Sequence, residues 1–202
     1  MTASPAAADL PAGLVLAAGR SRRMGASKLT MPWKGGQSIV ESVVSALRKG
    51  GVDRILVVVG VEAGPVELTL KDRRVEFVVN PNADRAEMLE SIHFGLRALG
   101  DGPPAAVITP GDMPSLQPST VAALLETWAE ARQALCVPSY GGRRGHPVIL
   151  PRRAWPDVLA LGPEQSLRSY LRRHEKEIRH VEVPDPGIRE DVDTPQDYRR
   201  DR

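Results

Sequence analysis

Short apolar runs rich in β-branched residues alternate with amphipathic helical patterns along most of this chain. The apolar runs lie at residues 13–17, 54–60, 75–80, 105–110 and 134–138. Several are apolar at successive positions, which is typical of strands covered on both faces. This alternation predicts an α/β fold with a mainly parallel central sheet.

Three helices are predicted between these strands. Ser38 followed by Glu41 forms a capping-box pattern in front of an apolar stripe, so a helix is expected to begin there. Two further apolar stripes predict helices over about residues 86–99 and about residues 118–131. Pro118 suits the first turn of the last one.

The last third of the chain is expected to add to the same sheet. After Tyr140 the sequence predicts a turn and a strand, then a short basic helix at "SLRSYLRRH", a strand at "IRHVEVP" and a terminal helix. We expect residues 13–202 to form one domain. Residues 1–12 lack the features of a secretory signal and are expected to be a disordered tail.

The charge balance argues against one class of partner. The 202 residues include 27 basic and 25 acidic side chains, a formal net charge of +2, which is not the field of a nonspecific nucleic-acid binder. No apolar stretch approaches the ~20 residues that a membrane helix needs. The single cysteine, Cys136, is predicted to be a buried free thiol. We therefore expect a cytoplasmic protein with neither nucleic-acid nor membrane partners.

Polar segments fall at or near the ends of four predicted strands. They are the loop from Gly19 to Lys28, Asn80-Pro81, Gly111-Asp112 and the region around His146. In an open α/β sheet, ligands bind in the crevice beyond the carboxyl ends of the strands. The convergence of these segments predicts a ligand site at that edge.

The first of these segments places cations around two glycines directly after a strand. Gly19 and Gly25 allow main-chain N–H groups to turn toward an anion, and arginine and lysine side chains add charge and directed donors. This chemistry favours a phosphate chain over a solvated basic turn. Spacing excludes the P-loop, and Ser21 stands where the dinucleotide fingerprint needs its second glycine.

Six motifs follow one another along the chain. "LAAGRSRRMGASK" fits the pattern L-A-A-G-x-S-x-R-M-G-x-x-K, and it is followed by "NP", Met-x-x-Ser, "DMP", "GHP" and "DVDTPQDY". In this order they resemble the MobA-like nucleotidyltransferases, most closely the branch that contains molybdopterin cytidylyltransferase. The resemblance covers nearly the whole chain and implies a Rossmann-like three-layer nucleotidyltransferase fold.

The resemblance also implies which residues bind the nucleotide. The loop from Leu16 to Gly25 would wrap a nucleoside triphosphate, with Arg23 and Lys28 on its phosphates. Ala18 stands where guanylyltransferase relatives usually have a second glycine, which favours a pyrimidine nucleotide such as CTP. The implied nucleotide-binding residues are Leu16, Ala17, Ala18, Gly19, Ser21, Arg23, Gly25, Lys28, Asn80, Ser91 and Asp112.

Carboxylates at two places are candidate metal ligands. Asp112 follows an apolar strand on a turn, and Mg²⁺ is commonly held by one or two carboxylates together with substrate phosphates and water. An aspartate there can also simply cap the next turn. The resemblance implies Asp193 as the second ligand of Mg²⁺. Asp191 is the alternative, and Asp197 is expected to support the terminal helix.

These assignments imply a transfer reaction with Arg23, Lys28 and Asp112 as its catalytic residues. A phosphorylated acceptor would attack the α-phosphorus of the nucleotide, and pyrophosphate would leave. Because a phosphate is already anionic, positioning and charge neutralisation can suffice without a strong general base. The candidates on the acceptor side, in or beside "GHP", are Arg143, Arg144 and His146.

Two departures from the family pattern bear on specificity. Glu87 stands where relatives commonly have a glycine, and an acidic side chain near phosphates is unfavourable unless it points away or approaches a base amino group. The "GDxGAR" segment common in the branch appears here as "GPEQSLRSYL". Because that segment lies on the acceptor side in the family, the acceptor can differ from molybdopterin.

Three functions follow as alternatives. The leading one is Mg²⁺-dependent transfer of CMP from CTP to molybdopterin, with a molybdoenzyme or its chaperone as a further partner. The second keeps the chemistry but uses another phosphorylated metabolite. The third is a noncatalytic carrier of the molybdenum cofactor. The joint presence of Arg23, Lys28, Asp112 and Asp193 favours an enzyme, since a carrier needs no metal pair.

Overall fold

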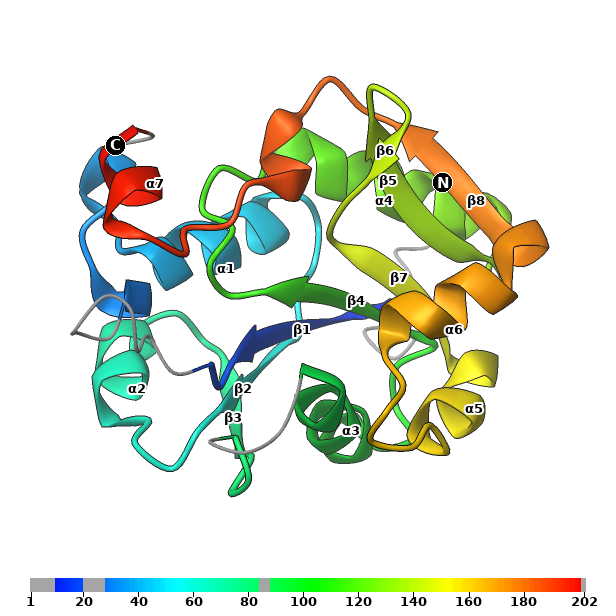
Figure 1. Ribbon diagram of the computed structural model, residues 1–202, viewed down its shortest axis with the longest axis horizontal. Helices are drawn as coiled ribbons and strands as arrows, with labels where there is room; N and C mark the ends of the chain where they lie inside the picture. The colour runs from blue at the N-terminus through cyan, green and yellow to red at the C-terminus, as the bar shows by residue number, and fades with distance from the viewer. Residues whose placement is uncertain (1–9, 20–27, 84–87, 201–202) are drawn as a thin grey trace, which may run out of the picture.

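The strands of this protein form one twisted sheet through the middle of the molecule (Figure 1). The structure is a computed structural model that describes residues 10–19, 28–83 and 88–200. Within these residues the sheet has eight strands. They are β1 (Ala12–Ala17), β2 (Ile55–Val59), β3 (Glu76–Val79), β4 (Ala105–Pro110), β5 (Leu135–Tyr140), β6 (Arg143–Arg144), β7 (Val148–Pro151) and β8 (Ile178–Glu182).

The strand order is β3-β2-β1-β4-β7-β5-β6, and β8 pairs with the other side of β5. The first four strands in this order are mutually parallel, with Leu14 beside Leu56 and Ile108. β7 is antiparallel to β4 and β5, whereas β5 and β8 run parallel. The expected mainly parallel sheet is therefore confirmed, and β7 is where its direction changes.

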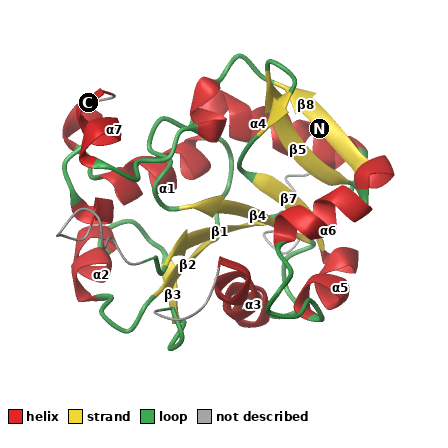
Figure 2. Ribbon diagram, in the orientation of Figure 1, coloured by secondary structure: helices red, strands yellow, loops and turns green. Residues whose placement is uncertain are grey.

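Helices cover both faces of the sheet, which gives three layers (Figure 2). One face carries α1 (Ile39–Lys49), α2 (Gly64–Leu70) and α4 (Pro118–Glu130), and the other carries α3 (Met88–Leu99), α5 (Trp155–Leu159) and α6 (Leu167–Arg173). A terminal helix, α7, spans Pro195–Arg200. Within the described residues, no helix has the length and apolar character needed to cross a membrane.

Strand β1 shows how the sequence builds two cores. Its residues are apolar at successive positions, and alternate side chains point to opposite faces of a strand. Val15 packs with the core under α1, α2 and α4, while Leu14 packs with the core under α3, α5 and α6. Both side chains are fully buried, as the run of successive apolar residues predicted.

The expected helices are present, and their ends follow from local chemistry. The Ser38 hydroxyl accepts a hydrogen bond from the Glu41 backbone N–H, and the Glu41 carboxylate accepts one from the Ser38 N–H at 2.8 Å. This confirms the predicted capping box at the start of α1. The structure adds α2 and α5, which the sequence pattern did not indicate, and β1 begins at Ala12 rather than at residue 13.

Cys136 is fully buried in β5, and burial raises the pKa of its thiol to about 11, an effect that the positive charge of Arg179 opposes. We therefore expect no modification of the native protein by iodoacetamide at pH 8, because only the thiolate reacts and about one thiol in 10³ is ionised there. Mass spectrometry after reaction in buffer and in guanidinium chloride checks this. Rapid labelling of the native protein would contradict it.

Candidate active site

The carboxyl ends of β1 and β4 lie side by side at one edge of the sheet. The backbone N–H of Gly111, just after β4, donates to the carbonyl of Leu16 in β1 at 2.9 Å. A side chain at position 111 would press on this carbonyl, since a Cβ would lie 3.2 Å from its oxygen. This close approach brings Asp112 to the end of β1, from which the cationic loop departs.

Lys28 joins two carboxylates that are far apart in the sequence. Its Nζ lies 2.7 Å from Oδ2 of Asp112 and 2.7 Å from Oδ1 of Asp193. The side chain of Lys28 is 11% exposed, against 20% for Asp112 and 47% for Asp193. One ammonium therefore holds together the two residues that the sequence pattern proposed as a metal pair.

The surroundings of Lys28 fix its charge. Burial by itself lowers the pKa of Lys28, but the charges of Asp112 and Asp193 and their hydrogen bonds raise that pKa above its ordinary value. The lysine is therefore a cation at neutral pH. Nearby, burial and the charge of Asp193 raise the pKa of Asp191.

Asp112 has one carboxylate oxygen that the lysine does not use. Its Oδ1 atom is buried and has no hydrogen-bond partner within the described residues. A buried carboxylate oxygen without a partner is costly, and a cation is a natural partner for it. The described residues contain no group of three or more His, Cys, Asp or Glu side chains placed to hold a metal. Because the described residues supply no third such ligand, we expect substrate oxygens or water to provide the other ligands of any ion bound by Asp112 and Asp193.

The segment from residue 185 to residue 194, near the C-terminal end of the sequence, extends from the start of α4 to Asp112. Asp185 is buried and accepts hydrogen bonds from Gln117 N–H at 2.9 Å and the Thr120 hydroxyl at 2.6 Å, at the start of α4. Further along, the backbone N–H of Val192 donates to the Asp112 carbonyl at 2.9 Å. These bonds carry Asp193 to the side of Asp112.

Asp197 takes no part in this pair. Its Oδ2 accepts hydrogen bonds from the backbone N–H of Thr194 at 2.9 Å and from the Thr194 hydroxyl at 2.7 Å. In return, Thr194 Oγ1 accepts from the Asp197 N–H. Asp197 therefore supports the first turn of α7, as predicted.

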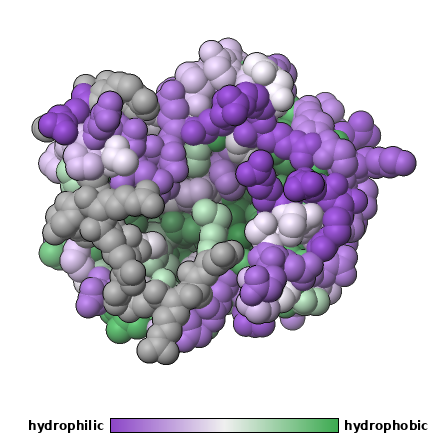
Figure 3. All heavy atoms as spheres, viewed as in Figure 1, coloured by the Kyte–Doolittle hydropathy of each residue, from purple (hydrophilic) through white to green (hydrophobic). Residues whose placement is uncertain are grey.

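Two adjoining pockets open around these residues. The smaller, about 330 Å³, is called here the carboxylate pocket and is lined by Leu16, Ala18, Gly19, Lys28, Leu29, Ala83, Met88, Ser91, Pro110, Asp112, Asp191 and Asp193. The larger, about 880 Å³, shares Met88, Pro110 and Asp191 with it. In Figure 3 this face of the molecule is hollowed at its centre, with hydrophobic residues inside and hydrophilic ones beside them.

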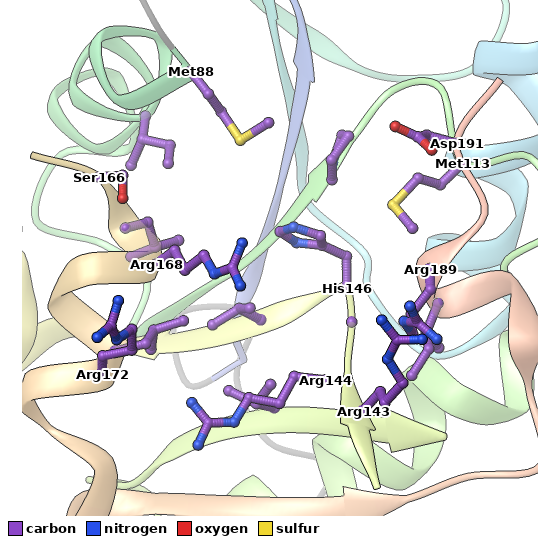
Figure 4. A pocket seen from close by; sticks show the side chains of 18 of the residues that line it. Met88, Met113, Arg143, Arg144, His146, Ser166, Arg168, Arg172, Arg189 and Asp191 are labelled. Carbon is purple, nitrogen blue, oxygen red and sulfur yellow. The ribbon is translucent and has the colours of Figure 1, made fainter. Parts of the chain in front are cut away.

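The larger pocket, called here the arginine pocket, contains the candidates for the acceptor side. Arg143, Arg144 and His146 all line it, and Figure 4 shows His146 near its centre. The Nδ1 atom of His146 is buried and has no hydrogen-bond partner within the described residues. Burial lowers the pKa of His146, while the backbone of Ile108 and the charge of Asp112 oppose this effect. The ring is therefore neutral at pH 7.

The predicted nucleotide-binding residues fall into several groups. Those in the carboxylate pocket are Leu16, Ala18, Gly19, Lys28, Ser91 and Asp112. Ala17 points to the opposite face of β1 and packs in the core under α1. Ser21, Arg23 and Gly25 lie outside the described residues, as do Arg20, Arg22 and Glu87.

Asn80 supports the site from behind. It is fully buried, its Nδ2 donates to the Ser91 hydroxyl at 3.0 Å, and its Oδ1 accepts from the Asn82 N–H at 2.9 Å. Because the described residues already bind both polar atoms of its side chain, Asn80 holds the turn after β3 against α3. Direct contact of Asn80 with a nucleotide stays a prediction.

Sequence reasoning missed three arginines of the arginine pocket. Arg168 and Arg172 come from α6, and Arg189 comes from the 3₁₀ helix η6 (Pro186–Arg189). The spacing of Arg168 and Arg172 was the available signal, because residues i and i+4 share a helix face. The sequence predicted a short basic helix at "SLRSYLRRH", and the resemblance placed part of that segment on the acceptor side, but neither assigned a role to these arginines.

Gly145 lets the segment carrying Arg189 approach β6 and β7. His146 N–H donates to the carbonyl of Ile188 at 2.8 Å, and a Cβ on Gly145 would collide with that carbonyl. We expect Gly145→Ala to destabilise the fold by about 1–3 kcal/mol, because the backbone has to shift. Thermal unfolding measures this. Gly64→Ala is the control, since a Cβ there meets nothing within 4 Å, and equal melting temperatures for both variants would contradict the expectation.

Two characterised proteins are similar to this chain over almost its whole length. The purine catabolism protein PucB of Bacillus subtilis (strain 168) is 30% identical over 195 residues, covering 92% of this chain and 93% of PucB. The molybdenum cofactor cytidylyltransferase of Escherichia coli (strain K12) is 25% identical over 186 residues, covering 92% of both. These names describe two different roles, so the similarity supports a common family more than a single substrate.

A solved structure agrees with the sequence comparison. Rv0371c from Mycobacterium tuberculosis H37Rv superposes with a TM-score of 0.82 and 25% identity, over 95% of this chain and 96% of that one. The family model described as "MobA-like NTP transferase domain" matches residues 13–178, which include β1 except its first residue, Lys28, Asp112 and all of α6. The predicted family is confirmed, and the chain belongs to the MobA-like NTP transferases.

Proposed function

We propose that this protein transfers CMP from CTP to a phosphorylated acceptor, with release of pyrophosphate, and that the acceptor is molybdopterin. The observation that carries the proposal is the Asp112–Lys28–Asp193 arrangement in a pocket that shares a wall with an arginine-lined pocket. Ala18 and the similarity to the E. coli molybdenum cofactor cytidylyltransferase support the choice of CTP and molybdopterin.

In the proposed reaction the carboxylate pocket takes the triphosphate and the arginine pocket takes the acceptor. An oxygen of the acceptor's phosphate forms a bond to the α-phosphorus, and the bond from the α-phosphorus to the departing pyrophosphate breaks. The attacking oxygen is already anionic, so no proton has to be removed. Lys28, together with Arg23 of the preceding loop, stabilises the charge that develops on pyrophosphate.

The residues at the carboxylate pocket fit Mg²⁺. Asp112 gives one oxygen to Lys28, and its other oxygen is buried and has no partner within the described residues. We propose that this oxygen and Asp193 hold the ion, with oxygens of the triphosphate and water completing its ligands. When bound, Mg²⁺ supplies charge neutralisation on the triphosphate.

The proposal is tested by following pyrophosphate release with Mg²⁺, molybdopterin and each of CTP, GTP, ATP and UTP. We expect release with CTP only when molybdopterin is present, and a product with the mass of the cytosine dinucleotide. Asp112→Asn serves as the inactive control. If pyrophosphate is released faster with GTP than with CTP, the proposed base specificity is wrong, but the proposed nucleotidyl transfer still holds.

A second acceptor class deserves the same assay because of the segment that replaces "GDxGAR". That segment contributes Ser166, Leu167, Arg168 and Leu171 to the arginine pocket and brings no aspartate into it. Another phosphorylated metabolite would then replace molybdopterin in the same reaction. If no nucleotide gives product while molybdopterin binds tightly, the protein is a noncatalytic carrier instead.

A further inference from the structure

The arginine pocket carries more positive charge than a single phosphate requires. Its lining includes five arginines from three separate elements, and among the described residues only Glu175 and Asp191 add acidic side chains to it. The arginines are Arg143 and Arg144 from β6, Arg168 and Arg172 from α6, and Arg189 from η6. Each of these three elements thus places at least one arginine side chain in the lining of the same pocket.

Four of these five arginines have no counterion in the part of the chain that the structure describes. Arg144 forms an ion pair with Glu175, whose carboxylate also lies 3.2 Å from His180 Nε2. Within the described residues, no ion pair or hydrogen bond engages the other four guanidinium groups. Like charges gathered in one concavity repel one another, and a bound anion relieves this repulsion.

The unpaired arginines stand on two sides of the pocket. Arg168 and Arg172 project from one face of α6, and Figure 4 shows Arg143 and Arg189 together on the opposite side. In Figure 4, His146 lies between the two sides. This arrangement matches a ligand with two separated anionic groups.

The two sides also differ in their relation to the reaction centre. Arg189 lies two residues before Asp191, which lines both pockets, whereas α6 contributes no residue to the carboxylate pocket. An anion held by Arg143 and Arg189 would therefore lie beside the segment that leads into the carboxylate pocket. An anion held by Arg168 and Arg172 would instead be bound by a helix that contributes nothing to the carboxylate pocket.

We infer that the acceptor carries a second anionic group besides the phosphate that attacks the nucleotide, and that Arg168 and Arg172 are the residues that select for it. The inference rests on the proposed function for the assignment of this pocket to the acceptor. It favours the second acceptor class proposed above, another phosphorylated metabolite, and narrows that class to compounds with two separated anionic groups, either phosphates or carboxylates.

The test compares pairs of probes that differ by one anionic group, by isothermal titration calorimetry at constant ionic strength. The pairs are fructose 6-phosphate with fructose 1,6-bisphosphate, and glycerol 3-phosphate with 3-phosphoglycerate. For the wild type we expect at least one pair to show about tenfold tighter binding of the member with the extra anion, because one charge-assisted hydrogen bond contributes that much. The double variant Arg168→Gln/Arg172→Gln should lose this preference.

Arg173→Gln is the control, because it removes one positive charge from the same helix at a position that does not line the pocket. This variant should keep the wild-type preference. Three results would overturn the inference. The wild type could bind both members of each pair equally, Arg173→Gln could lose the preference as fully as the double variant does, or no probe could bind. If no nucleotide supports pyrophosphate release but binding still depends on Arg168 and Arg172, the proposed transferase activity is wrong. The inference that this pocket binds a ligand with two anionic groups would then still hold.

Discussion

Asp112→Asn is expected to lower kcat at least about 10³-fold while leaving the fold intact. The carboxylate binds the Lys28 ammonium through Oδ2 at 2.7 Å, and its buried Oδ1 has no partner within the described residues. Asparagine keeps the size of the side chain, but it removes the charge and places an N–H donor where one of two cations needs an oxygen. Single-turnover pyrophosphate release measures the loss, and thermal unfolding measures the fold.

Substitutions at other aspartates, both near the site and far from it, serve as controls for this variant. Asp193→Asn should also be severe, because Asp193 shares Lys28 with Asp112, whereas Asp53→Asn removes an exposed carboxylate far from the site. Comparison with Asp191→Asn decides which C-terminal aspartate belongs to the pair. Wild-type activity in Asp112→Asn would remove Asp112 from the reaction.

Lys28→Met is expected to lower kcat by about 10²–10³-fold, because the proposed reaction loses a fixed cation near the departing pyrophosphate. The variant should also lose about 1–3 kcal/mol of stability, since Asp112 and Asp193 are left close together without the ammonium between them. The loss stays below that of a fully buried pair because Asp193 is half exposed. Pyrophosphate release and guanidinium unfolding measure the two effects separately.

Lys49→Met supplies the comparison for Lys28→Met. Lys49 is an exposed residue in the last turn of α1, so its replacement should leave kcat unchanged and alter stability by no more than about 0.5 kcal/mol. A Lys28→Met protein that is as stable and as active as the wild type would show that the bridge between the carboxylates has no function.

The two helices with the clearest apolar stripes, α1 and α3, were predicted from the sequence, whereas the two missed helices, α2 and α5, have no such stripe. α1 and α3 bury residues along their whole length, so the period of 3.6 residues stands out. α2 spans seven residues and buries only Val66 and Leu70. Two buried residues give no stripe, and the tertiary packing of the turn after β2 decides that a helix forms there.

The part of the candidate site that lies at the ends of strands could be predicted from the sequence. The part that depends on the orientation of α6 could not. Because β1 and β4 are parallel neighbours, the loop after β1 and the turn bearing Asp112 had to meet at one edge. The side from which Arg168 and Arg172 enter depends on how Leu167 and Tyr170 pack into the core. That packing is a property of the assembled sheet, so the basic helix alone could not indicate its ligand.

The contact between Lys28 and Asp193 spans 165 positions of the chain. During synthesis the strands from β1 to β7 can pair before the carboxylate pocket is complete, because Asp193 follows these strands in the chain and is made after them. A chain truncated before residue 193 can therefore bury most of its core and still lack half of the bridged pair. Assembly of the Asp112–Lys28–Asp193 arrangement thus waits for the segment that follows β8.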